Sequence, residues 1–175
     1  NEAVFSRYIG HGDVVMVNST PAGGHISHQR AGAVGHYTEN VVFFPLTEDG
    51  YHIDIERSRE LILAVKPTLL VFGKSLFLFP EPIADLLDTA RSVQARVVYD
   101  GAHVLGLIAG KQFQDPLGEG VDLVMGSSHK TFPGPQRGVI LSDLDADEWR
   151  TIDRGAFPGS SSNHHLDTLP PLLVT

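Results

Sequence analysis

The sequence has no cysteine among its 175 residues. This absence excludes disulfide bonds, thiolate metal sites and cysteine nucleophiles. No apolar run approaches the ~20 residues that a membrane-spanning helix requires. Basic side chains are also few: 13 lysines and arginines against 21 aspartates and glutamates give a net charge of −8. That balance argues against a nucleic-acid partner and against binding to an anionic membrane. The composition predicts a cytoplasmic globular protein, long enough to bury a core.

Nine histidines raise the question of a metal site. His25 and His28 have the i, i+3 spacing of one helix face, but no H-E-x-x-H or comparable ligand set accompanies them. His164 and His165 are adjacent, so their side chains point in different directions. We therefore expect no metal site.

Apolar segments typical of strands alternate along the chain with segments typical of helices. Strands are expected at residues 14–17, 41–45, 68–72, 96–99, 121–125 and 139–141. Helices are expected at residues 23–30, 54–65, 83–93 and 145–152, and a long one beginning at Leu169. This alternation predicts an α/β fold of three layers, in which helices cover both faces of a mainly parallel sheet.

Residues 126–135 (GSSHKTFPGP) are the most informative part of the sequence. They follow a buried apolar run, and their glycine and prolines shape the backbone on both sides of Lys130. A lysine at the mouth of an α/β sheet is a candidate for Schiff-base chemistry, because desolvation makes the neutral amine available. Most lysines are solvated surface charges, so Lys130 needs a second signature beside it.

That second signature is residues 97–103 (VVYDGAH). Asp100 follows a β-branched and aromatic run, at the strand end where open α/β sheets bind ligands. Enzymes that use pyridoxal phosphate need a carboxylate against the pyridine nitrogen and a lysine for the aldehyde. Asp100, His103 and Lys130 together supply such a set. Taken singly, Asp100 is equally well interpreted as a turn residue and His103 as a packed or capping histidine.

Four motifs resemble the serine hydroxymethyltransferases in order and spacing. They are residues 12–13 (GD), 23–28 (GGHISH), 99–107 (YDGAHVLGL) and 128–131 (SHKT). The resemblance implies pyridoxal-phosphate fold type I, with an aspartate-aminotransferase-like large domain. It also implies that residues 1–175 are the central part of that cofactor-binding domain, without the N-terminal arm and the C-terminal small domain.

The resemblance also implies roles for single residues. Lys130 matches the Schiff-base lysine and Asp100 matches the partner of the pyridine nitrogen. His103 would contact the phenolic oxygen of the cofactor, and His25 would stack on the pyridine face. His129 matches the histidine that precedes the lysine throughout the family. Lys130, His129 and His25 are therefore the candidate catalytic residues.

Further positions are implied at the edge of the cofactor site. Ser75 would lie beside the cofactor. In the family, the loop that corresponds to residues 160–165 reaches the cofactor phosphate of the neighbouring subunit. Ser162 and Asn163 would offer donors to that phosphate, and the protein would be a homodimer or a higher homo-oligomer.

Two segments depart from the usual family pattern. Residues 134–138 read GPQRG, so Gln136 stands where arginine is expected and Arg137 comes one place late. Residues 157–165 (FPGSSSNHH) replace a stretch that is usually Gln-Gly-Gly. Both changes are similar to a divergent subgroup that includes archaeal-type enzymes and the threonine transaldolases of secondary metabolism. They leave the use of folate open.

The resemblance implies a hydroxymethyltransferase-like enzyme that cleaves or forms the Cα–Cβ bond of a β-hydroxy amino acid. Pyridoxal 5′-phosphate would be its cofactor and tetrahydrofolate its candidate cosubstrate. The alternatives are a threonine transaldolase or aldolase, and a catalytically silent fragment used for assembly.

Overall fold

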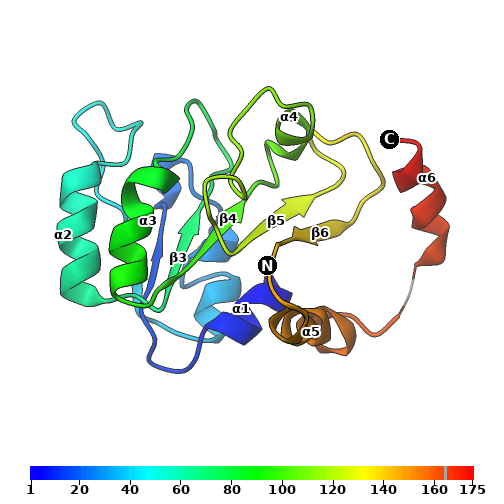
Figure 1. Cartoon of the computed structure of the whole chain (residues 1–175), viewed down its shortest axis with the longest axis horizontal. Helices are drawn as coiled ribbons and strands as arrows, with labels where there is room; N and C mark the ends of the chain where they lie inside the picture. Colours follow the sequence, from blue (N-terminus) through cyan, green and yellow to red (C-terminus); the bar gives the residue numbers. More distant parts are fainter. Residues whose placement is uncertain (164) are drawn as a thin grey trace.

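The computed structural model of the chain describes residues 1–163 and 165–175. His164, one of the two adjacent histidines, lies outside the described residues. Within the described part, six strands form one sheet in the order β2-β1-β3-β4-β5-β6 (Figure 1). The strands are β1 (Val15–Val17), β2 (Val41–Phe43), β3 (Leu69–Phe72), β4 (Arg96–Asp100), β5 (Leu123–Ser127) and β6 (Gly138–Leu141). All neighbouring pairs are parallel except β5 and β6, so the predicted α/β fold with a mainly parallel sheet is confirmed.

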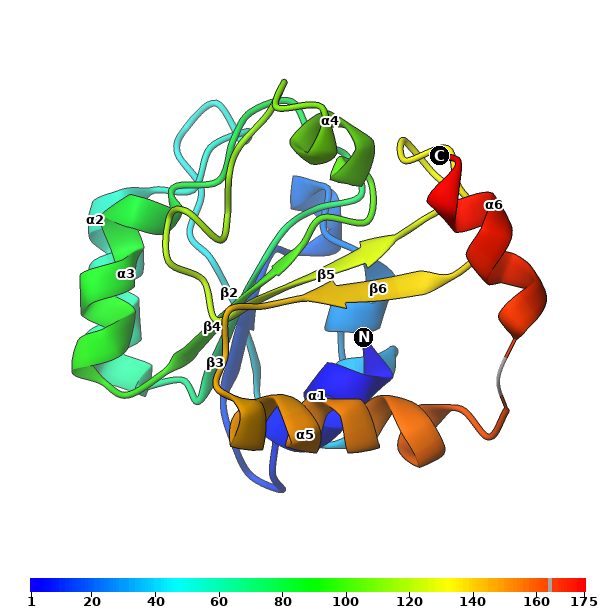
Figure 2. The ribbon, with the colours of Figure 1, turned by 45° about the vertical axis from the view of Figure 1, so that its right-hand side comes forward.

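Alternate residues of the central strands bury side chains on opposite faces of the sheet. On one face, Leu70 and Phe72 of β3 belong to a core that includes residues of α2 (Ile55–Val65) and α3 (Ile83–Ser92). On the other face, Leu69 and Val71 belong to a core that includes residues of α1 (Glu2–Tyr8) and α5 (Ala146–Arg154). Figure 2 shows α1 and α5 together on the side of the sheet away from α2 and α3. The three-layer prediction is therefore correct.

The boundaries of α2 follow from its sequence. Asp54 is the N-cap, and its side chain accepts a hydrogen bond from the backbone N–H of Arg57 at 3.0 Å. Lys66 ends the helix in the left-handed conformation, with φ of 46°, and Pro67 cannot continue it. The negative charge of Glu56 in the first turn interacts favourably with the positive end of the helix dipole.

The sequence did not predict α1 or the short helix α4 (Leu105–Ala109). The predicted helix over residues 23–30 is wrong, because only a 3₁₀ turn forms there, at Ile26–His28. Gly23 has φ of 92°, and a Cβ atom at Gly24 would lie 2.1 Å from the carbonyl oxygen of Asn18. This close packing holds the segment in an irregular path. A helix does begin at Leu169, as expected, and α6 covers Leu169–Leu173.

The strand expected at residues 121–125 begins and ends two residues later, because of its pairing. Leu123 pairs with β4 in parallel, whereas Gly126 and Ser127 pair with the antiparallel strand β6. The glycine and serine that are typical of a turn are thus held in the sheet by a strand whose direction the sequence did not reveal.

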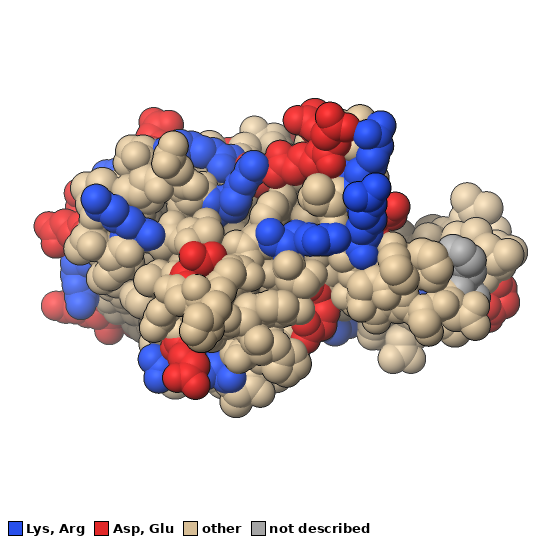
Figure 3. All heavy atoms as spheres, turned by 90° about the horizontal axis from the view of Figure 1, so that it is seen from below, with Lys and Arg blue, Asp and Glu red and all other residues tan. Residues whose placement is uncertain are grey.

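No described helix is long and apolar enough to cross a membrane. On the face shown in Figure 3, acidic and basic side chains lie next to one another.

The carboxyl end of β3 approaches β4 very closely at Gly73. This residue has φ of +107°, and a Cβ atom there would lie 2.2 Å from the carbonyl oxygen of Asp100. Two independent requirements, a left-handed backbone and a close approach, therefore need glycine at this position.

We expect Gly73→Ala to destabilise the protein more than Gly50→Ala, the matched control. Gly50 also has a positive φ, of +73°, but a Cβ atom added there would have nothing within 4 Å. Gly50→Ala should lower the free energy of unfolding by about 1–2 kcal/mol through backbone strain alone. Gly73→Ala should lower it by roughly a further 1–3 kcal/mol through the clash with Asp100. Urea unfolding measures both values, and equal losses would contradict the close approach.

Candidate active site

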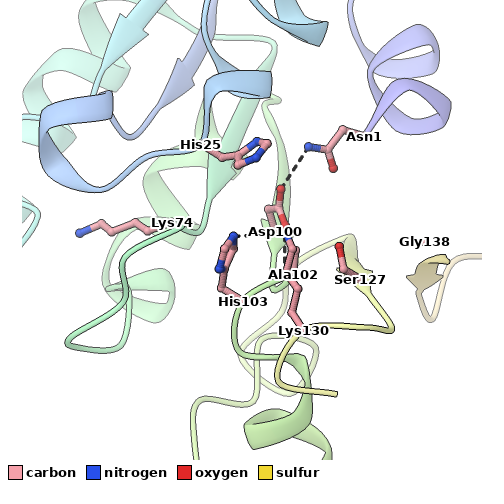
Figure 4. Close-up of a pocket in the computed structure, with 10 residues that line it drawn as sticks. Asn1, His25, Lys74, Asp100, Ala102, His103, Ser127, Lys130 and Gly138 are labelled. Carbon is pink, nitrogen blue, oxygen red and sulfur yellow. Dashed lines mark hydrogen bonds between the residues drawn. The ribbon is translucent and has the colours of Figure 1, made fainter. Parts of the chain in front are cut away.

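A cavity of about 230 Å³ opens at the carboxyl edge of the sheet, where β4 and β5 end. Its lining combines a buried carboxylate, two imidazoles and the amine of Lys130 (Figure 4). The lining residues are Asn1, His25, Lys74, Asp100, Ala102, His103, Gly126, Ser127, Lys130 and Gly138. Four of the residues predicted from the sequence, His25, Asp100, His103 and Lys130, are therefore brought together in one place.

Asp100 is the last residue of β4 and is 6% exposed. Its Oδ2 atom lies 2.9 Å from Nε2 of His28 and accepts a hydrogen bond from Nδ2 of Asn1 at 3.1 Å. Its Oδ1 atom accepts from the backbone N–H of Ala102 at 3.0 Å. Burial alone would raise the pKa of Asp100, but these hydrogen bonds and the interaction with His28 hold it well below its usual range. The cavity therefore contains a carboxylate that stays ionised although it is buried.

His28 is a residue of the site that the sequence motifs did not assign to it. Its side chain is fully buried, and its ring meets those of Phe5 and His25 edge-on, with centroids 6.0 and 5.9 Å away. An ionised carboxylate can only accept, so the contact with Asp100 places a proton on Nε2 of His28. His28 is a positioning residue that fixes the carboxylate. Its i, i+3 spacing from His25 was the available signal, but that spacing alone indicates a metal motif and not a partner for an aspartate.

Lys130 and the two cavity-lining imidazoles form the open side of the site. Nζ of Lys130 lies 3.2 Å from Nε2 of His103, and the rings of His103 and His25 are 6.4 Å apart. Burial lowers the pKa of His103, and so does the nearby charge of Lys130. Burial also lowers the pKa of His25, with further lowering by His28 and Lys130. Both imidazoles are therefore biased towards the neutral form, which has one nitrogen free to accept a proton.

Four other predicted residues do not line this cavity. His129 is exposed next to Lys130. Ser75 follows β3, and its backbone N–H donates to the carbonyl of Gly23 at 2.7 Å. Ser162 and Asn163 are exposed beyond α5, and Asn163 lines a different groove, beside α6. Their roles towards the cofactor stay predictions.

The residues that depart from the family pattern also lie outside the cavity. Gln136 is exposed. The backbone N–H of Arg137 donates to Oγ of Ser128 at 3.1 Å, and its Nε donates to Oγ1 of Thr168 at 3.3 Å. Arg137 thus joins the loop after β5 to the C-terminal segment.

Known proteins resemble this chain over most of its length. The family model of serine hydroxymethyltransferase matches residues 1–161. A serine hydroxymethyltransferase of Thermoplasma acidophilum is 45% identical over 175 residues, which are the whole of this chain and 41% of that protein. One from Picrophilus torridus is 47% identical over the whole chain and 40% of its own length.

A third relative, a serine hydroxymethyltransferase of Methanothermobacter thermautotrophicus, is 50% identical over 168 residues. The alignment covers 95% of this chain and 39% of that protein. The chain thus spans about 40% of the length of the curated relatives that it matches. The resemblance inferred from the four motifs is confirmed, and the chain belongs to the serine hydroxymethyltransferase family.

Proposed function

We propose that this chain carries the pyridoxal-phosphate site of a hydroxymethyltransferase. The observation that carries the proposal is that Asp100 and Lys130 line one cavity, with His103 in contact with the lysine. These groups come from the ends of two neighbouring parallel strands, β4 and β5. The carboxyl ends of parallel strands are where open α/β sheets place their ligands.

The donor set of the cavity fits pyridoxal phosphate. The buried, ionised Asp100 would face a protonated pyridine nitrogen, and Nζ of Lys130 would hold the aldehyde carbon. His103 would donate to or accept from the phenolic oxygen, and His25 would lie against the ring. When bound, the cofactor supplies an electron sink for a carbanion at the α-carbon of an amino acid. The chain's own contribution is to keep Asp100 charged and to hold neutral imidazoles beside the reacting amine.

Lys130 suits the cofactor better than Lys74, the other lysine of the cavity. Nζ of Lys74 lies 3.1 Å from the Glu81 carboxylate and donates to the carbonyl of Tyr51 at 3.1 Å. Two acceptors therefore engage that amine. For Lys130, the contact found within the described residues is with the imidazole of His103, which can accept a proton.

The relatives named serine hydroxymethyltransferase support serine and glycine as the substrate pair. We propose tetrahydrofolate as the cosubstrate. Transfer of the hydroxymethyl carbon of serine that requires added tetrahydrofolate supports this choice. Folate-independent cleavage of a β-hydroxy amino acid would favour the threonine transaldolase or aldolase alternative instead.

We expect borohydride reduction of the protein with bound pyridoxal phosphate to place the phosphopyridoxyl group on Lys130. Peptide mass spectrometry identifies the modified residue. Lys130→Arg should lose the adduct, because a guanidinium is not a nucleophile at neutral pH. Lys111→Arg, in an exposed turn, is the matched control and should keep it. An adduct on Lys74 with Lys130 unmodified would refute the proposal.

We further propose that the site is completed by a second copy of the chain. Ser162 and Asn163 are exposed and lie outside the cavity of their own chain, as residues that serve a neighbouring subunit would. We expect the protein that carries this chain to sediment as a dimer or larger. A monomer with full turnover would show that residues 160–165 form an ordinary surface loop.

A further inference from the structure

Five buried polar side chains gather behind the cavity, on the side of Lys74. We refer to them as the rear polar cluster: Asn18, Gln29, Lys74, Glu81 and Gln114. Each is at most 9% exposed. Such a concentration of buried polar groups requires an explanation, because polar groups are costly to bury unless they are satisfied.

The centre of the rear polar cluster is an ion pair between Lys74 and Glu81. The two side chains are 6% and 1% exposed, and Nζ lies 3.1 Å from Oε1. The second carboxylate oxygen, Oε2, accepts from Nδ2 of Asn18 at 2.8 Å. Gln114 fixes the backbone of Glu81 from both sides, since its Nε2 donates to the Glu81 carbonyl and its Oε1 accepts from the Glu81 N–H.

The rear polar cluster is connected to the cavity by short paths. Lys74 itself is one of the lining residues, although Figure 4 shows its amine, on the left, pointing away from Asp100 and Lys130. Nδ2 of Asn18 also donates to the carbonyl of Gly73 at 3.3 Å. Nε2 of Gln29 donates to the carbonyl of Asn18 at 3.0 Å and lies 3.4 Å from that of His25. The cluster therefore holds both the segment after β3 and the turn that carries His25.

A second connection runs through the backbone. The N–H groups of Ser75 and Leu76 both donate to the carbonyl of Gly23, at 2.7 and 3.2 Å. Gly23 lies two residues before His25. Fixing Lys74 thus fixes the stretch of backbone on which the His25 turn rests.

Stability alone does not account for a buried ion pair. Desolvation of two charges offsets much of their attraction, and well-packed apolar residues in their place are often equally stable. A pair of fixed length and direction does, however, set the path of the connection between β3 and α3, since it holds Lys74 at the start of that connection against Glu81 near its end.

We propose that the Lys74–Glu81 pair is a positioning element for the cofactor site. It holds the segment after β3 and the His25 turn in the position that a planar ring requires when its face lies against His25 and its nitrogen faces Asp100. The inference rests on the proposed function, since it concerns how the same cavity binds its ring. Lys74 then acts through His25 and Ser75 and is not itself a nucleophile.

The test is the double variant Lys74→Met/Glu81→Leu, made in the protein that carries this chain. Both replacements are apolar and of similar size, so the urea midpoint of unfolding should stay close to that of the unmodified protein. The dissociation constant of pyridoxal phosphate should nevertheless rise by roughly ten- to a hundredfold, because the ring contacts are displaced. The matched control is Asp147→Asn/Arg150→Gln, which removes an exposed ion pair of 2.6 Å on α5 and should leave the dissociation constant unchanged.

A double variant with normal stability and normal cofactor affinity would overturn the inference. If the double variant does not fold, Lys74→Met alone is measured under conditions where its circular dichroism is native. An unchanged dissociation constant in that variant overturns the inference, and a raised one supports it. Failure of the proposed function itself would give a distinct result, because the unmodified protein would then form no phosphopyridoxyl adduct at Lys130.

Discussion

The contact between His28 and Asp100, 2.9 Å long and buried, is the interaction on which the site depends. It joins residues 72 positions apart in the sequence and ties the turn after β1 to the end of β4. Without such a donor a buried carboxylate would take up a proton, since burial favours the neutral form. With it, the cavity keeps a negative charge away from water, and a cationic ring nitrogen is the natural partner of such a charge.

The parallel sheet determines where the residues of the site lie. The sheet places three parallel strands next to one another: β3, β4 and β5. Because parallel strands end at the same edge of a sheet, Gly73, Asp100 and Ser127 all lie at that edge. The helices on both faces pack against fully buried strand residues, which leaves the carboxyl edge as the place where polar side chains can meet. The rear polar cluster and the His28–Asp100 contact both lie at this edge, next to Gly73 and Asp100.

The sequence revealed those features that are local. Asp100 and Lys130 could be found because each follows an apolar run that ends in a turn, and α2 could be bounded because Asp54 and Pro67 are local signals. His28 was missed because its role depends on a contact with a distant strand. The turn at residues 23–30 was misjudged because close backbone packing at Gly24 leaves no trace in helical periodicity. The antiparallel direction of β6 and the Lys74–Glu81 pair likewise depend on the tertiary structure, so local sequence patterns did not reveal them.

The central claim is that Asp100 keeps the ring nitrogen of bound pyridoxal phosphate protonated. Nitrogen-15 NMR of labelled cofactor bound to the protein tests this directly, because the chemical shift of the ring nitrogen reports its protonation. We expect a protonated nitrogen at neutral pH in the unmodified protein and an unprotonated one in Asp100→Asn, whose amide is nearly isosteric but uncharged. The same protonation state in both proteins would contradict the account.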